Sequence, residues 1–175
     1  TARVVLDTLG VANYGIYNLV GGIVTIISFI NGTMAGATQR FLNYEMGKGE
    51  PGKLQRTFSN SLLIHTGIAL LVLLLGETAG LWFVNTQLVI APERMLAANI
   101  TYQLSLLAAM ASIVQIPYTA SVMAHERMNI YAGLSVLNVV LKLLVALSLT
   151  LFATIDTLVV YASLMLAATM AIAIL

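Results

Sequence analysis

Five long stretches of the chain are almost free of charged residues, and short polar links separate them. Residues 8–39, 95–125 and 157–175 contain no Asp, Glu, Lys or Arg, residues 57–92 contain only Glu77, and residues 128–155 contain only Lys142. A helix needs about 20 mostly apolar residues to cross roughly 30 Å of hydrocarbon. The pattern therefore predicts five spanning helices, at about 14–38, 58–84, 95–122, 129–152 and 157–175.

Other fold classes fit this pattern poorly. A soluble helical bundle carries a charged stripe on its outer face, and the strands of an outer-membrane barrel alternate over about 10 residues. Neither pattern occurs in the five stretches. We therefore expect an all-α, polytopic transmembrane bundle that forms a single region over residues 1–175. The chain begins without Met and stops inside an apolar run, so we also expect a fragment of a longer transporter-like chain.

The composition excludes several function classes. Hydrophobic residues make up 59% of the chain and charged residues 9%, against about 25% charged in an ordinary soluble domain. The net charge of +1 provides no basic surface for nucleic acid. Without cysteine there is no disulfide framework, thiolate zinc site or thiol nucleophile. His65 and His125 belong to no metal-binding spacing, so we predict neither an enzyme nor a metal or other cofactor.

The basic residues in the links predict the orientation. The link 40–56 contains four basic residues and four residues expected to break a helix: Arg40, Lys48, Lys53 and Arg56, and Gly47, Gly49, Pro51 and Gly52. The link 123–127 adds Arg127 on the same face, because two spans separate the links. The other face receives only Arg3 and Arg94. The positive-inside rule then favours a cytoplasmic 40–56 link. Aromatic residues near span ends predict an interfacial belt: Tyr14, Tyr17, Trp82, Tyr102, Tyr118 and Tyr131.

Lys142 is the main candidate for chemistry. It lies near the middle of the expected 129–152 span, about ten residues from either end, where a charge costs at least a few kcal/mol unless water or a partner meets it. One interpretation is a cation that lines a polar cavity and binds an anionic group of a substrate. The alternative is a structural lysine that pairs with a carboxylate such as Glu77 or turns toward a neighbouring helix.

Other polar residues inside the spans are weaker candidates. Glu77, within Gly76-Glu77-Thr78-Ala79-Gly80, is either a proton or sodium site or an interfacial residue near the outer surface. Asn18, Gln115 and Asn138 either line an aqueous cavity or form hydrogen bonds between helices. Pro92 is expected to begin the third span. Pro117 removes a backbone hydrogen bond, so we expect a kink near residues 113–117, which is either a hinge or ordinary packing.

Two segments of the chain resemble those of a known family. The segment Leu9-Gly10-Val11-Ala12-Asn13-Tyr14-Gly15-Ile16-Tyr17-Asn18-Leu19, followed by a span that ends in Ala37-Thr38-Gln39-Arg40-Phe41, resembles the start of polysaccharide and lipid-linked oligosaccharide flippases. These belong to the multidrug/oligosaccharidyl-lipid/polysaccharide (MATE-like) exporter superfamily. The loop Gly47-Lys48-Gly49-Glu50 and the turn Ala124-His125-Glu126-Arg127-Met128-Asn129 are similar to cytoplasmic links of that family.

The resemblance implies helices two to six of about twelve to fourteen, part of an N-terminal bundle, with Arg40 at the cytoplasmic end of helix two. It implies a multi-pass protein of the bacterial inner membrane that moves undecaprenyl-diphosphate-linked oligosaccharide, for polysaccharide, O-antigen or lipopolysaccharide synthesis, by alternating access. Its partners would be the lipid bilayer, this lipid-linked substrate and the remaining helices. Lys142 would then meet phosphate or acidic sugar. The alternatives are a cation-coupled multidrug exporter of the same superfamily, for which a deep acidic residue is expected, and a structural or assembly membrane protein.

Overall fold

The computed structural model describes residues 2–149 and 156–174, apart from the side chains of residues 2–4, 7, 8, 11, 12, 23–31 and 51. The described part is helical, which confirms the all-α prediction. Its elements are α1 (Ala2–Lys48), α2 (Pro51–Leu75), a π-helical turn (Gly76–Gly80), α3 (Leu81–Thr86), a 3-10 turn (Pro92–Arg94), α4 (Met95–Ala124), α5 (Met128–Ser148) and α6 (Thr157–Ile174).

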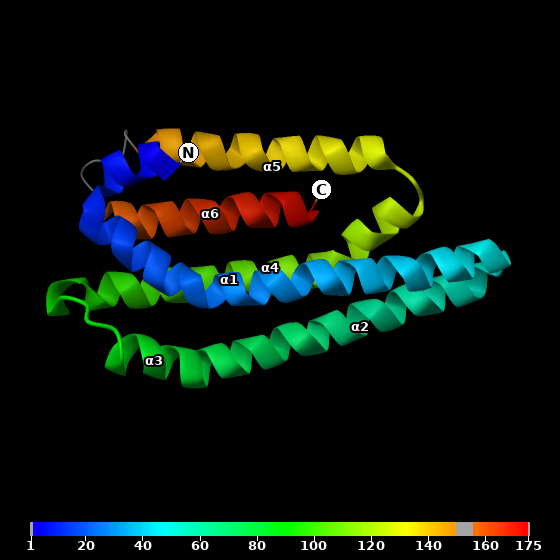
Figure 1. Ribbon diagram of the computed structural model, residues 1–175, viewed down its shortest axis with the longest axis horizontal. Helices are drawn as coiled ribbons and strands as arrows, with labels where there is room; N and C mark the ends of the chain where they lie inside the picture. The colour runs from blue at the N-terminus through cyan, green and yellow to red at the C-terminus, as the bar shows by residue number, and fades with distance from the viewer. Residues whose placement is uncertain (1, 150–155, 175) are drawn as a thin grey trace.

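Helix α4 lies at the centre of the bundle. It packs against α1, α2 and α6, while α5 lies on the far side of α6 (Figure 1). The buried positions of α4 include many alanines: Ala97, Ala98, Ala109, Ala120 and Ala124. Small side chains let helices approach closely when lipid supplies no hydrophobic driving force between them. The alanine-rich face therefore explains why α4 is the helix that the others surround.

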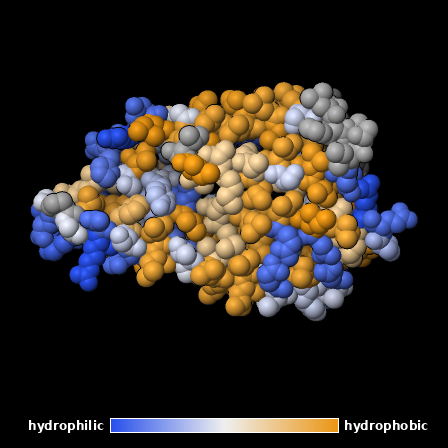
Figure 2. Space-filling view, turned by 180° about the vertical axis from the view of Figure 1, so that it is seen from behind, coloured by the Kyte–Doolittle hydropathy of each residue, from blue (hydrophilic) through white to orange (hydrophobic). Residues whose placement is uncertain are grey.

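Four helices among the described residues are long and apolar enough to cross a membrane: Gly52–Thr86, Pro92–Ala124, Met128–Ser148 and Thr157–Ile174. They coincide with the second to fifth expected spans, although residues 150–152 and Leu175 lie outside the description. The first expected span, 14–38, falls inside α1, but the side chains of residues 23–31 lie outside the description, so this first span remains an expectation. Figure 2 shows a broad hydrophobic band across the middle of one face, with hydrophilic residues gathered toward both ends.

The expectation that the whole 40–56 link is non-helical is wrong. Helix α1 continues to Lys48 and α2 begins at Pro51, so only Gly49 and Glu50 separate them. Gly49 has φ +69°, a conformation that glycine adopts without strain, and its N–H donates to the Met46 carbonyl at 3.1 Å. Pro51 fits the first turn of α2. Gly47 and Gly52 lie within helices, because one glycine costs a helix only about 1 kcal/mol.

The two basic links lie at the same end of the bundle, as predicted from the sequence. Leu42 near the end of α1 packs against Ala120 and Ala124 at the end of α4, and Figure 1 shows the α1–α2 turn and the α4–α5 turn at one end. We call this the basic end. At the opposite end Arg94 donates to Asp156 at 3.0 Å, and the other Asp156 oxygen accepts from the Leu158 N–H at 3.3 Å at the start of α6.

The start of α1 is a short helical piece that sequence patterns did not predict. Gly10 has φ +74° and ψ 162°, which breaks α1 and lets the first turns change direction. Val5 and Leu9 are buried against Val145 and Ala146 of α5. The break at Gly10 thus places the N-terminal turns over α5 and α6, at the end opposite the basic end (Figure 1).

Two prolines lie at the start of α4 and within it. Pro92 starts the 3-10 turn that leads into Met95, so the helix begins where predicted. Pro117 is fully buried, and α4 remains a continuous helix through it. Figure 1 shows the last turns of α4 tilting toward α5.

One residue assigned to the aromatic belt belongs to the core instead. Tyr102 is fully buried, and its hydroxyl donates to the Gly76 carbonyl at 2.8 Å. A π-helical turn shifts the backbone hydrogen bonds out of the usual pattern, and the tyrosine supplies a partner for this carbonyl. The belt assignment of Tyr102 is therefore wrong, because tertiary packing buries its ring and gives its hydroxyl the Gly76 carbonyl as an acceptor.

Candidate functional site

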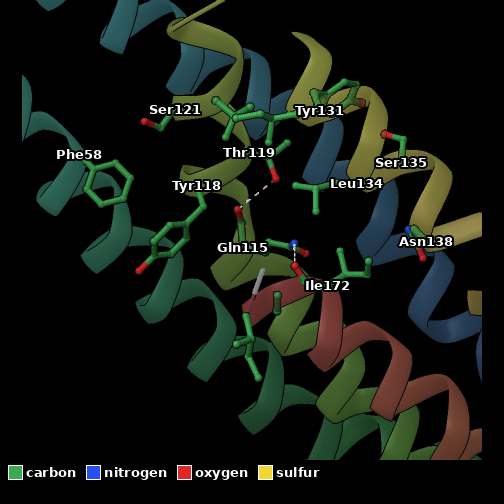
Figure 3. A pocket seen from close by; sticks show the side chains of 14 residues that line it. Phe58, Gln115, Tyr118, Thr119, Ser121, Tyr131, Leu134, Ser135, Asn138 and Ile172 are labelled. Atoms are coloured by element: carbon green, nitrogen blue, oxygen red, sulfur yellow. Dashed lines mark hydrogen bonds between the residues drawn. The ribbon is translucent and has the colours of Figure 1, made fainter. Parts of the chain in front are cut away.

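Two cavities lie between α4, α5 and α6. The first, about 680 Å³, is nearer the basic end, and Figure 3 shows its lining side chains. Its polar lining groups are Gln115, Tyr118, Thr119, Ser121, Tyr131, Ser135 and Asn138. We call it the end cavity. The second, about 460 Å³, includes α1 in its wall and is lined by Lys142, Asn18, Ser105 and Thr169 among others. We call it the central cavity.

One face of α5 connects the two cavities. Tyr131, Ser135, Asn138 and Lys142 follow one another at intervals of four, three and four residues, a spacing that places them on one side of a helix. The first three line the end cavity and Lys142 lines the central cavity. We call these four residues the α5 polar face. It presents hydroxyl groups, an amide and an ammonium group in succession along the helix axis.

Gln115 forms a hydrogen bond between helices at the wall of the end cavity. Its Nε2 donates to the Ile172 carbonyl at 3.0 Å, which joins α4 to α6 (Figure 3). Thr119, one turn away, donates its hydroxyl back to the Gln115 carbonyl at 3.4 Å. The Gln115 amide oxygen stays available as an acceptor, so this side chain combines the two roles that the sequence left open.

Lys142 lies closer to a helix end than expected. Helix α5 ends at Ser148, six residues or about 9 Å beyond Lys142, rather than ten residues beyond it. Its side chain is exposed on this part of the bundle. The ion pairs among the described residues are Lys53–Glu50 and Arg94–Asp156. The structure therefore does not bring Lys142 and Glu77 together, and the proposed Lys142–Glu77 pair is not formed.

Asn18 is the second predicted candidate in the central cavity. Its Nδ2 donates to the Tyr14 carbonyl at 2.8 Å, one turn back along α1. The neighbouring Tyr17 packs edge to face against Tyr161 of α6, with ring centroids 4.8 Å apart. This contact packs α1 against α6 beside the central cavity, which Asn18 also lines.

The remaining predicted residues lie away from these cavities. Arg40 is exposed near the end of α1. Glu77 is exposed in the π-helical turn and accepts a hydrogen bond from Gln103 Nε2 at 3.0 Å. Pro117 is packed inside the bundle. The structure therefore brings together Gln115 with Asn138 and Asn18 with Lys142, whereas Arg40, Glu77 and Pro117 belong to neither group.

A third cavity, about 320 Å³, lies between α1 and α2. It is lined mainly by apolar groups, with Thr38, Thr57, Asn60, Ser61 and His65 as polar members. His65 is 3% exposed, and its Nδ1 lies 2.7 Å from the Ser61 carbonyl. Within the part of the chain that the structure describes, no three His, Asp or Glu side chains gather as a metal site would require.

Several residues that line the cavities were not predicted from the sequence, although the helical spacing of polar residues indicates them. Tyr131 and Ser135 share the helical spacing of Asn138 and Lys142. On α4 the polar residues Ser105, Ser112, Gln115 and Thr119 are spaced by seven, three and four residues, again one face of a helix. The missed signal was polar periodicity within an apolar span.

Comparison of the chain with protein-family models, with curated proteins and with solved structures finds no match.

Proposed function

We propose that this chain is part of a membrane transporter, a flippase that moves lipid-linked oligosaccharide across the bacterial inner membrane by alternating access. The observation that carries the proposal is the α5 polar face, which lines two successive cavities and reaches its cationic member, Lys142, in the second. The sequence resemblance described above supplies the substrate class and the membrane.

The chemistry of the two cavities suits such a substrate. Sugars present many hydroxyl groups, and the end cavity offers hydroxyl and amide partners from Ser135, Asn138 and Gln115. A diphosphate needs a cation, and hydrogen bonds between charged groups are the strong ones. The Lys142 ammonium is a point charge on a flexible stem, so it can follow a phosphate without fixed bidentate geometry.

A cation-coupled multidrug exporter is the second candidate. For it, we expect a carboxylate within the bundle cavities. Glu77 is exposed, hydrogen-bonded to Gln103 and outside the lining of both cavities. The positions of Lys142 and Glu77 therefore favour the flippase.

The proposal is tested by substituting Lys142 in the full-length protein reconstituted into liposomes. The substrate is an undecaprenyl-diphosphate-linked fluorescent oligosaccharide, and flipping is followed by quenching from outside. Removal of a charge-assisted hydrogen bond costs about 1.5–3 kcal/mol, so Lys142→Ala should lower apparent affinity roughly ten- to hundredfold. Lys142→Arg should keep partial function.

Lys53→Ala is the matched control. It removes the same charge from an exposed lysine, which pairs with Glu50 at 2.7 Å in the α1–α2 turn, and should leave flipping unchanged. Wild-type flipping by the Lys142→Ala protein would refute the role of Lys142. Proton- or sodium-driven export of cationic drugs that is lost in Glu77→Gln would favour the second candidate.

A further inference from the structure

His65 lies inside the bundle, in the α2 part of the apolar segment Gly52–Thr86, and it belongs to neither of the cavities assigned to substrate. It is 3% exposed and sits where α1 and α2 face each other. Ionisable residues within spanning segments are costly and usually mark substrate, ion or proton pathways. The contacts of its two ring nitrogens therefore determine what this buried histidine can do.

The two ring nitrogens have different surroundings. Nδ1 lies 2.7 Å from the Ser61 carbonyl oxygen. A carbonyl only accepts, so Nδ1 carries the proton and donates it. Nε2 is buried without a hydrogen-bond partner in the described structure. In the neutral ring, Nε2 is therefore the nitrogen that bears the lone pair and has no donor beside it.

Among the described residues, the groups around His65 include no counter-ion. Ser61 Oγ lies 3.4 Å from Nδ1 and 3.3 Å from Thr38 Oγ1, and the residues that line the adjacent cavity from α1 and α2 are otherwise uncharged. Helix α4, which also packs against α2, contains no Asp, Glu, Lys or Arg, and its titratable groups are Tyr102 and Tyr118. The charged residues of α1 and α2 whose side chains the structure describes lie outside the cavity lining: Arg40, Glu45, Lys48, Lys53 and Arg56.

These contacts link a proton on Nε2 to the packing of α1 on α2. A proton taken up from water converts the ring to a cation with a second N–H donor. In the packed arrangement, no described residue offers that donor an acceptor or that charge a partner, and an unpaired buried charge is strongly unfavourable. The adjacent cavity is the nearest space in which water can meet the ring if α1 and α2 separate.

We propose that His65 is a proton-binding site that couples proton uptake to opening of the α1–α2 interface, and thereby drives transport with protons. The proton moves from water on one side of the membrane to the Nε2 lone pair while the interface is open, and it leaves to water on the other side in the course of the transport cycle; no other group changes charge. The driving role rests on the proposed transport function, whereas the coupled opening does not. By linkage, a proton that binds the open arrangement better shifts the population toward it.

The first experiment needs no substrate. The chain has no cysteine. Thr38→Cys reports access to the cavity beside His65, because Thr38 lines that cavity and is only 7% exposed, and Gln55→Cys, exposed near the turn, normalises reagent reactivity. Between about pH 8 and 5.5, the range in which histidine ordinarily changes charge, normalised labelling of Thr38→Cys should rise about tenfold. The rise should vanish in His65→Gln.

His125→Gln is the matched control. His125 Nδ1 lies 2.8 Å from the Ser121 carbonyl, the same contact with the residue four positions back, but His125 is exposed. This variant should keep the rise in labelling. Equal rises in the wild type and His65→Gln would overturn the proposal. In case His65→Gln fails to fold, ¹⁵N NMR of histidine-labelled wild-type protein gives a second test. A His65 ring that stays neutral at pH 5.5 would also overturn the proposal.

Transport then separates the two proposals. In liposomes that contain the wild-type protein, an imposed pH gradient should accelerate flipping several-fold, and His65→Gln should abolish the acceleration while Lys142 remains intact. A flipping rate that does not depend on the pH gradient would refute proton-driven transport and leave the flippase proposal intact. If the protein does not flip the lipid but labelling still responds to pH, the flippase proposal is refuted and the proposal of proton-coupled opening is supported.

Discussion

Gly80 is the position where one added methyl group should disturb the bundle most. A Cβ atom there would overlap the Tyr102 hydroxyl and lie 3.0 Å from the ring carbon Cζ. Tyr102 is fully buried and donates to the Gly76 carbonyl, so it has no free space into which it can retreat. Gly80→Ala must therefore displace the ring and break that hydrogen bond.

The expected magnitude follows from three contributions. Overpacking a close-packed site costs about 1–3 kcal/mol, and loss of the Tyr102–Gly76 hydrogen bond costs about 1 kcal/mol. Replacing glycine by alanine in a helix stabilises the helix by about 1 kcal/mol. Gly80→Ala should therefore lower the free energy of unfolding by about 2 kcal/mol, measured by reversible unfolding of the full-length protein in mixed micelles.

Two comparisons make this prediction specific. A Cβ at Gly67 meets no atom within 4 Å, so Gly67→Ala should be neutral or up to about 1 kcal/mol stabilising. Tyr102→Phe alone should cost about 1 kcal/mol. In combination with Gly80→Ala it removes the overlapping hydroxyl, so the double variant should be more stable than the sum of the single effects implies. Additive effects, or a Gly80→Ala protein as stable as Gly67→Ala, would refute this reasoning.

Two further predictions concern topology and α4. With the basic end in the cytoplasm, a cysteine at Thr86 should react with an impermeant reagent in whole cells and a cysteine at Lys48 should not; the reverse result would invert the orientation. Pro117→Ala restores an N–H that can donate to the Ile113 carbonyl. If the tilt of the last turns of α4 shapes the end cavity, this variant should insert normally yet flip the lipid-linked substrate more slowly. Unchanged flipping at normal abundance would assign Pro117 to packing alone.

The sequence by itself determined the all-helical class, the four apolar helices that match expected spans and the two basic links at one end. These follow from one-dimensional properties. Length and hydropathy decide which segments avoid water, and the number of crossings between two links decides whether they share a face. The start of α4 at Pro92 was also predictable, because a proline in the first helical turn acts locally.

Side-chain partners were decided by the tertiary structure alone. The sequence left both a cavity position and a hydrogen bond between helices open for Asn18, Gln115 and Asn138, because an amide can serve either purpose until its neighbours are known. Tyr102 was predicted to be interfacial, but its ring is buried and its hydroxyl donates to a carbonyl of the π-helical turn. Glu77 and Lys142 were predicted as one alternative pair, but the fold places them apart. Helical periodicity groups polar residues on a face, as it does Asn138 and Lys142, but it does not state which helix that face meets. The neighbours of His65 became known only when α1 packed against α2, because hydrogen bonding and burial depend on contacts between segments that the sequence does not specify.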